Sequence, residues 1–289
     1  MCYRITSVFV EQTKTICEFT NADSWVILSE IEQSIKRKIE AIGTPLKDWD
    51  IQINYGIKTG FNDAFIISTE KRNEILSNCR SDDERSRTEE LIRPILRGRD
   101  IKRYGYDWAN LWLIATFPSR HYDIEEYPAV KEYLLSFGMK RLEQTGKSYN
   151  VGATAVKARK KTNNKWYETQ DSISYWEDFA QPKLVYNDIA QELSFALAED
   201  GIFLNNTAYF IGSENIDLLQ YFQKILNSKL MDWYYRTISV QLGEKAVRMF
   251  SIYVLRIPIP YPMRPLNETF DTYSLYDLST TEIDYIETY

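Results

Sequence analysis

The chain has 289 residues, of which 44% are hydrophobic and 26% charged, with a net charge of −6 and one histidine. This is the composition of a soluble globular protein, and it excludes a histidine-rich metal site. No apolar run approaches the roughly 18–20 residues of a membrane helix, and Arg4, Glu11 and Lys14 exclude a signal peptide. The three cysteines are an odd number without metal-type spacing, which favours a reducing cytoplasm over a disulfide framework.

Charge is distributed unevenly along the chain. Residues 267–289 contain acidic residues and no lysine or arginine, and they account for the whole net charge. Residues 140–165 are strongly basic, with Glu143 as the one acid. Local cations are what a phosphate-contacting surface needs, because their contacts release counterions from nucleic acid. A solvated basic loop is the alternative.

In chain order, Ser29 and Glu32 form a capping box, and isoleucines on one face predict a helix at 29–42 that ends at Gly43. Its apolar stripe faces either this chain's own core or a further catalytic domain. Other expected helical segments lie at 70–92, 127–142 and 216–238. We expect strands at 63–69, 110–117, 183–190 and 195–210, the last with a hairpin turn at Asp200-Gly201. Residues 144–165 lack periodicity and are predicted to form a long loop.

These elements predict an α+β fold with a mixed or antiparallel, strand-rich core, flanking helices and long loops. We divide the chain into an N-terminal helical connector (1–50), a main domain (51–262) and an acidic C-terminal tail (263–289). The tail has no periodicity, so we expect removal of residues 267–289 to leave the fold intact and to strengthen non-specific DNA binding.

A glycine-bounded loop precedes the first of these strands. Gly56 and Gly60 flank Lys58 and Thr59, and Asn62 follows. Glycine allows a tight turn or a close approach, and the polar residues suit a phosphate or a base edge. The spacing is not that of a P-loop. A plain turn before a strand is the alternative.

The glycine loop is the first of five short motifs that follow one another in a definite order along the chain. The glycine loop is followed by 91–104 (LIRPILRGRDIKRY), 182–190 (PKLVYNDIA), 203–211 (FLNNTAYFI) with 225–230 (ILNSKL), and 253–260 (YVLRIPIP). This succession resembles the C-terminal target-recognition (specificity) domain of TaqI-type DNA methyltransferases and type IIG restriction-modification enzymes, over about residues 25–262. The resemblance implies sequence-specific recognition of double-stranded DNA through the long loops. It also implies a methyltransferase or nuclease part, acting in cis or in trans, that methylates adenine or cleaves DNA.

No catalytic constellation is found in the sequence itself. It contains no G-x-G and no Pro-Pro, both expected of the resembled methyltransferases, and its one D/E-x-K, at Asp100, has no Pro-Asp upstream. His121 has no nucleophile motif beside it. We therefore expect no enzyme activity and no cofactor in this chain, with S-adenosylmethionine and magnesium belonging to the missing catalytic parts.

DNA contacts divide into phosphate grip and base readout. For phosphates we favour the glycine loop, the basic segment and the cations around Gly98, although pairing with Asp100 is an alternative for the last. Arginine suits guanine, while Asn and Gln suit adenine, so Arg159, Asn62, Asn163, Asn164 and Gln170 are candidates for base readout. The predicted DNA-binding residues are Lys58, Thr59, Asn62, Arg97, Arg99, Lys157, Arg159, Lys160, Lys161, Lys165, Tyr167, Gln170, Asn206, Lys245 and Arg248.

Two other functions remain open at this point. The glycine loop suits an enzyme that holds a phosphorylated small molecule or nucleotide. The 14% aromatic content and the acidic tail suit a protein-interaction module.

Overall fold

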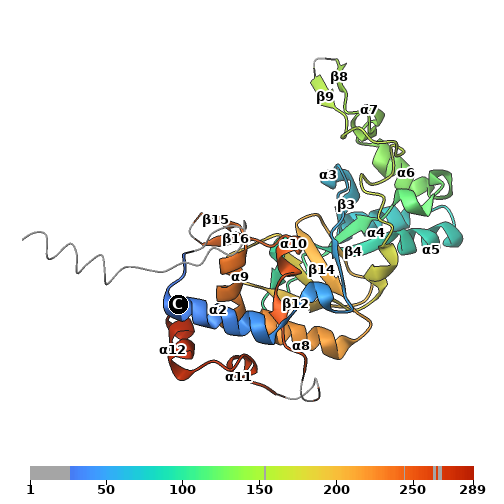
Figure 1. Ribbon diagram of the computed structural model, residues 1–289. Coiled ribbons are helices and arrows are strands. Elements are labelled where there is room, and N and C mark those ends of the chain that lie inside the picture. Colours follow the sequence, from blue (N-terminus) through green and yellow to red (C-terminus); the bar gives the residue numbers. More distant parts are fainter. Residues whose placement is uncertain (1–26, 153, 244, 263–264, 266–268) are drawn as a thin grey trace, which may run out of the picture. The chain divides into compact units, whose positions relative to one another are not determined.

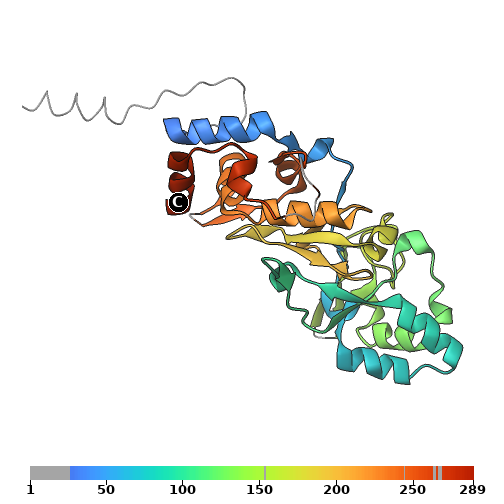
Figure 2. The same ribbon diagram turned by 90° about the horizontal axis from the view of Figure 1, so that it is seen from below.

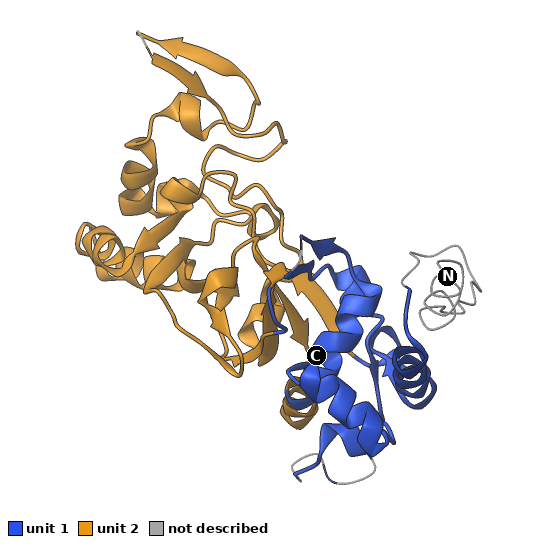
Figure 3. Ribbon diagram, turned by 90° about the vertical axis from the view of Figure 1, so that its left-hand side faces the viewer, with its two compact units in different colours: residues 1–50, 191–193, 224–289 blue, residues 51–190, 194–223 orange. Residues whose placement is uncertain are grey.

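The computed structural model describes residues 27–152, 154–243, 245–262, 265 and 269–289. The chain forms two compact units, coloured separately in Figure 3. Unit 1 comprises residues 1–50, 191–193 and 224–289, and unit 2 comprises residues 51–190 and 194–223. The expected boundary after residue 50 coincides with a unit boundary, whereas residues 224–262 belong to unit 1 and not to the body of the main domain.

Unit 2 contains most of the strands. They are β2 (Gln52–Tyr55), β3 (Ile66–Ser68), β4 (Ile92–Leu96), β5 (Ile101–Lys102), β6 (Gly105–Tyr106), β7 (Leu111–Ile114), β8 (Ser148–Val151), β9 (Thr154–Lys157), β10 (Lys183–Asn187), β11 (Ile189–Ala190), β12 (Phe195–Ala198), β13 (Phe203–Leu204) and β14 (Ala208–Gly212). Its helices are α3 (Asn62–Phe65), α4 (Thr69–Ser77), α5 (Asp82–Leu91), α6 (Pro128–Leu135) and α7 (Met139–Leu142), and α8 (Ile216–Leu226) continues from unit 2 into unit 1. Short 3-10 turns lie at η2 (Gly98–Asp100), η3 (Pro118–Arg120), η4 (Ile124–Glu126) and η5 (Trp176–Ala180).

Two four-stranded sheets form the centre of unit 2. One has the order β12-β10-β14-β2 and is antiparallel throughout, with Val185 opposite Phe210 and Tyr209 opposite Tyr55. The other has the order β13-β4-β7-β3, in which β13 and β4 are parallel. One antiparallel and one mixed sheet, with the helices beside them, confirm the expected α+β class.

The aromatic core of unit 2 is centred on Phe179. Its ring stacks on Phe203 of β13 with centroids 4.4 Å apart, and lies 4.8 Å from Phe210 of β14. All three side chains are buried. Because these strands belong to different sheets, Phe179 ties the two sheets into one hydrophobic core.

Several expected elements differ in detail. The turn at Asp200-Gly201 is present, but β12 pairs with β10 while β13 pairs with β4, so the expected hairpin is wrong. The predicted helix 216–238 is two helices, because Ser228 caps the start of a new one. Segments 70–92 and 127–142 are also each two helices, and the second of these breaks at Gly138, where φ is +84°. The predicted strand 63–69 begins as a helical turn and becomes extended at Ile66.

Unit 1 contains the remaining elements. They are α2 (Glu30–Ile42), β1 (Thr44–Pro45), η1 (Leu46–Asp48), α9 (Lys229–Ile238), β15 (Gln241–Leu242), β16 (Ala246–Arg248), α10 (Ser251–Val254), β17 (Pro258–Ile259), α11 (Thr272–Leu275) and α12 (Thr280–Thr288). The capping box of α2 is confirmed, and Gly43 ends the helix. A Cβ at Gly43 would lie 2.6 Å from Pro258, because β1 and β17 pair directly behind it.

The acidic tail is part of unit 1, which corrects the expectation that it is separable. Tyr276 and Ile286 are fully buried, and α12 lies beside α2 (Figures 1 and 2). The Glu282 carboxylate accepts hydrogen bonds from Lys38 and Ser34 of α2. Burial by itself raises the pKa of Glu282, but these bonds and those from Ser279 outweigh it and lower the pKa to about 2.

Candidate nucleic-acid interface

The predicted loop at 144–165 is largely an antiparallel hairpin. β8 and β9 pair with Tyr149 opposite Val156, and backbone bonds continue the pairing below them from Gly146 N–H to the Arg159 carbonyl at 2.8 Å. Most side chains of the two strands are exposed, and Figure 1 shows the hairpin projecting from the rest of unit 2. The prediction of a loop is therefore wrong, and β8–β9 is a two-stranded ribbon with its tip at Gly152, where φ is +61°.

Arg159 fixes the base of this ribbon. Its Nε donates to the Leu142 carbonyl at 2.8 Å and its Nη2 to that of Trp166 at 2.6 Å. Nη1 donates to the carbonyls of Glu168, at 2.7 Å, and Thr59, at 3.0 Å. The side chain is 2% exposed, and burial lowers its pKa to about 10, which leaves it charged at neutral pH. Arg159 is thus an internal anchor, contrary to the prediction that it reads a guanine.

Two amide side chains hold the segment that follows. Gln144 Nε2 donates to the carbonyls of Lys165 and Glu168, at 3.1 and 3.0 Å. Asn164 Nδ2 donates to those of Thr169 and Gln170, at 3.1 and 2.9 Å. Asn164 therefore shapes the loop and does not present its amide donors to a base, which corrects its predicted role.

The glycine loop is pinned against the turn after β13. A Cβ at Gly56 would lie 1.9 Å from the carbonyl oxygen of Asn205, so only glycine permits this approach. Thr59 is fully buried, and its hydroxyl donates to Asn62 Oδ1 at 2.7 Å and accepts from the Phe61 N–H at 3.1 Å. Thr59 therefore stabilises the loop and offers no exposed hydroxyl to a phosphate, contrary to the prediction.

The loop brings several predicted residues together. The Lys58 carbonyl accepts from the N–H of Gln170 at 3.1 Å, and Gln170 also packs beside Gly60. The Lys58 side chain is exposed, with its ammonium 5.3 Å from the centroid of the Tyr55 ring. Arg159 connects this loop to the ribbon through Thr59. Lys58, Asn62 and Gln170 thus share one assembly with the base of the ribbon.

The arginines and the lysines of the basic segment have different roles. Arg141 donates to the Lys157 carbonyl at 2.8 Å and stacks on Phe61, so it is engaged internally, as Arg159 is. Five predicted lysines are exposed, four in this segment and one in the glycine loop, and no described carboxylate forms an ion pair with any of them; they are Lys157, Lys160, Lys161, Lys165 and Lys58. Exposed cations without a carboxylate partner are available to neutralise phosphates.

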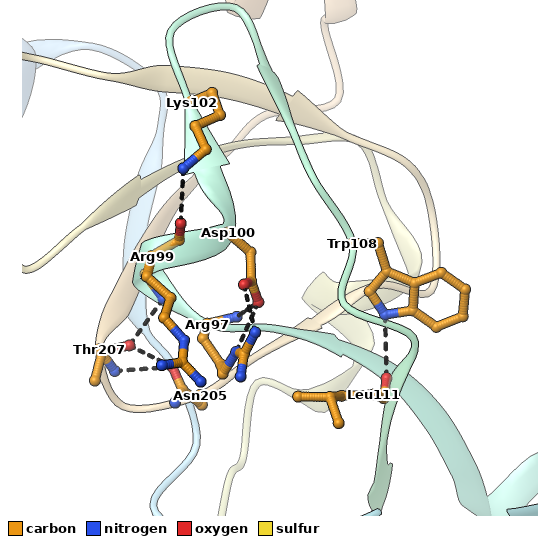
Figure 4. A network of polar contacts seen from close by, with 9 residues as sticks. Arg97, Arg99, Asp100, Lys102, Trp108, Leu111, Asn205 and Thr207 are labelled. Atoms are coloured by element: carbon orange, nitrogen blue, oxygen red, sulfur yellow. Dashed lines mark hydrogen bonds and ion pairs between the residues drawn. The ribbon is translucent and has the colours of Figure 1, made fainter. Parts of the chain in front are cut away.

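The cations around Gly98 divide in the same way. Arg97 forms a two-bond pair with Asp100, at 3.0 and 2.7 Å, and these bonds raise its pKa (Figure 4). Arg97 is therefore a structural residue here, while Arg99 is exposed. The Thr207 hydroxyl accepts from the Gly98 N–H at 2.8 Å and donates to Asn205 at 2.6 Å, which locks this turn.

The remaining predicted residues are dispersed. Asn206 is exposed. Tyr167 is only 5% exposed and its hydroxyl donates to the Tyr122 carbonyl at 2.8 Å, so its predicted contact with DNA is not supported by its position. Lys245 and Arg248 belong to unit 1, whereas the ribbon belongs to unit 2.

Sequence reasoning missed the ribbon residues Tyr149, Asn150, Val151 and Thr154. The available signal was weak: Ser148–Val151 and Thr154–Lys157 are short runs with β-branched residues on either side of Gly152. Lysines on both sides obscured it by suggesting a solvated loop.

Residues 93–259, more than half of the chain, match the family described as the TaqI-like C-terminal specificity domain. The chain belongs to this family. The resemblance inferred from the five motifs is thereby confirmed.

Relatives of this specificity domain are longer proteins. It is 24% identical over 250 residues to the type II methyltransferase M.PaeR7I of Pseudomonas aeruginosa, covering 86% of this chain and 39% of the relative. The chain thus spans well under half of that protein's length.

Among solved structures, it resembles the type IIL restriction-modification enzyme MmeI in complex with DNA, with 17% identity and a TM-score of 0.43 over 74% of this chain and 26% of that one. It also resembles the type IIG restriction endonuclease BpuSI, with 12% identity and a TM-score of 0.48 over 89% and 27% of the two chains.

Two kinds of feature are absent among the described residues. No helix among them is long and apolar enough to cross a membrane. No group of three or more His, Cys, Asp or Glu side chains among them is arranged to hold a metal ion.

Proposed function

We propose that this specificity domain recognises a specific sequence in double-stranded DNA by placing the β8–β9 ribbon in the major groove. The lysines beside the ribbon would grip the flanking phosphates. The observation that carries the proposal is the combination of a projecting ribbon, an internally anchored base and exposed lysines without ion-pair partners among the described residues.

The size and chemistry of the ribbon suit this role. The major groove of B-DNA is about 12 Å wide and accepts a two-stranded β-ribbon. Asn150, whose paired donor and acceptor suit adenine, is exposed near the tip, and Val151 is 47% exposed, an apolar surface that suits a thymine methyl group. Neither residue is held by the core of unit 2.

Rigidity of the base is equally important. Direct readout needs side chains held close to a fixed geometry, and an isolated two-stranded hairpin is marginally stable in water. Arg159 and Gln144 hold the strands below the ribbon through buried hydrogen bonds to backbone carbonyls. The ribbon can therefore keep its direction without packing along its length.

In this proposal the chain itself performs no chemistry. A methyltransferase or nuclease part, in the same polypeptide or a separate one, would act on cytoplasmic DNA that the ribbon positions. Adenine methylation, S-adenosylmethionine and magnesium would belong to that part. The absence of G-x-G and Pro-Pro from the sequence supports this division.

The test is selection of bound sequences from a random duplex library, followed by truncation of the ribbon. Ser148 and Lys157 face each other across the ladder, so a two-residue Asn-Gly turn can join them in place of residues 149–156. The wild-type chain should enrich one sequence motif. The truncated chain should bind DNA with a similar salt dependence and no sequence preference, because the lysines remain.

A truncated chain that enriches the same motif would place base readout elsewhere. A wild-type chain that shows no salt-dependent binding to duplex would contradict DNA recognition altogether.

A further inference from the structure

A second cationic region of unit 2 lies around a cavity of about 440 Å³. Its walls are formed by residues from α5, β4, the segment after β7, η5 and the turn before β13. Pockets that bind small molecules commonly measure about 300–1,000 Å³. Three arginines, Arg87, Arg93 and Arg120, line this cavity, with Glu90 as the one acidic residue among the described lining residues.

Arg93 is unusual for its position. It lies on β4, which is flanked by β13 and β7, and it faces buried Leu113 across the ladder. The apolar side chains of the same strand, Ile92, Ile95 and Leu96, are buried. No described residue forms a hydrogen bond or an ion pair with its guanidinium. A half-buried guanidinium without a carboxylate partner is available to bind an external anion.

The other two arginines are also without carboxylate partners among the described residues. Arg87 Nη2 donates to the backbone carbonyl of Glu126 at 3.2 Å. Arg120 stacks on the Trp176 ring, 3.9 Å from its centroid. The negative charge of Glu90 offsets one of the three arginine charges, so the cavity lining has two positive charges in excess. The apolar walls strengthen the field of these charges inside the cavity.

The remainder of the wall is aromatic. Phe117, Tyr122, Tyr127, Trp176 and Phe203 line the same cavity. Aromatic walls bind a planar ring, guanidinium groups bind phosphate oxygens through paired hydrogen bonds, and a carboxylate accepts a hydrogen bond from an amino group on a base. These three features together match the parts of a nucleotide.

We propose that this cavity is a binding site for a nucleoside monophosphate unit, with its base against the aromatic wall and its phosphate between Arg93 and Arg120. The unit comes either from a free nucleotide or from the 5′-phosphorylated end of a single strand. This site is separate from the β8–β9 ribbon and does not depend on the proposed function.

Calorimetric titration of the full chain tests the proposal. The probes are the four deoxynucleoside monophosphates, the corresponding deoxynucleosides, inorganic phosphate and a 5′-phosphorylated trinucleotide. The variants are Arg120→Gln, at an exposed position, and Arg93→Gln/Arg120→Gln. The control is Arg80→Gln/Arg85→Gln, which removes two exposed cations of the same unit that pair with Glu132 and Glu89.

At least one monophosphate should bind more tightly than both its nucleoside and inorganic phosphate. Each lost guanidinium should weaken it by about ten- to a hundred-fold, the usual effect of hydrogen bonds to charged groups. The control should bind like the wild type. Tighter, arginine-dependent binding of the trinucleotide would support the proposal and identify a strand end as the source.

Three results would overturn it: no binding of any monophosphate at millimolar concentration, equal binding of inorganic phosphate, or equal loss in the control variant. Duplex binding measured in parallel separates the two proposals. A chain that binds the monophosphate but no duplex retains this site and refutes the ribbon's role, and the reverse result refutes this site alone.

Discussion

The four exposed lysines near the ribbon should contribute most of the salt dependence of duplex binding. Their combined replacement by alanine concerns Lys157, Lys160, Lys161 and Lys165. Each phosphate contact contributes about 0.9 to the slope of log K against log salt, so the slope should flatten by about 2–4 units. If the variant and the wild type bind duplex equally at 1 M salt, a slope flatter by about 3 units means that the variant binds about 1,000-fold more weakly at 0.1 M salt. This difference in affinity is about 4 kcal/mol. Stability should change little, because exposed substitutions usually cost within about 0.5 kcal/mol each.

The assay is fluorescence anisotropy with a labelled duplex across a salt series. The matched control removes four cations of the same unit that already pair with carboxylates, namely Lys71, Arg80, Arg85 and Lys131. Both variants carry the same net charge, so only the position of the lost charges differs. If the two variants show the same slope, the interaction reflects overall charge and the lysines near the ribbon are ordinary surface residues.

Three further predictions concern stability. Arg159→Met should lower the free energy of unfolding by about 3 kcal/mol or more, because buried backbone carbonyls lose their hydrogen-bond donor. Urea denaturation measures this, and a loss below about 1 kcal/mol would show that water replaces the guanidinium. Ile286→Ala should cost about 2–4 kcal/mol, since the side chain is fully buried, and an unchanged urea midpoint would mean that α12 does not pack on unit 1. The depressed pKa of Glu282 stabilises the fold above its unfolded pKa of 4.5, and this is lost as the pH falls toward 2. Glu282→Gln should therefore lower the free energy of unfolding by about 1–3 kcal/mol at pH 6 and by less at pH 2.5. If the urea midpoints of wild type and variant differ equally at the two pH values, the lowered pKa of Glu282 does not contribute to stability.

The sequence predicted those elements whose signals are local. The helix at α2 follows from a capping box and an isoleucine stripe within 14 residues of chain, and the buried strand β10 follows from its apolar run. The family resemblance also came from short motifs. What the sequence did not predict depends on distant partners.

Arg159 is the clearest example. It stands in a run of lysines and was interpreted as an exposed base reader, but its acceptor Thr59 lies 100 residues away in sequence. The same reason explains the ribbon, whose two strands have few apolar residues and depend on anchors outside themselves. For the tail, the acidic residues concealed Ile286 and Tyr276, which are buried because the tail packs on elements distant in sequence: α12 contacts α9 and α2, and the Tyr276 hydroxyl donates to the Pro258 carbonyl of β17.

The pairing of β2 with β14 has a consequence for how unit 2 forms during synthesis. Tyr55 finds its partner Tyr209 only after roughly 150 further residues are made, which takes about 8–30 s at typical ribosomal rates. Ile95 must likewise wait for Phe203. During that interval β2 lacks its partner strand, and β4 is paired with β7 on one edge only, so each leaves an unpaired edge of the kind that promotes aggregation. We therefore expect the yield of folded protein to depend on the rate of translation and on chaperones, even if the completed unit is stable.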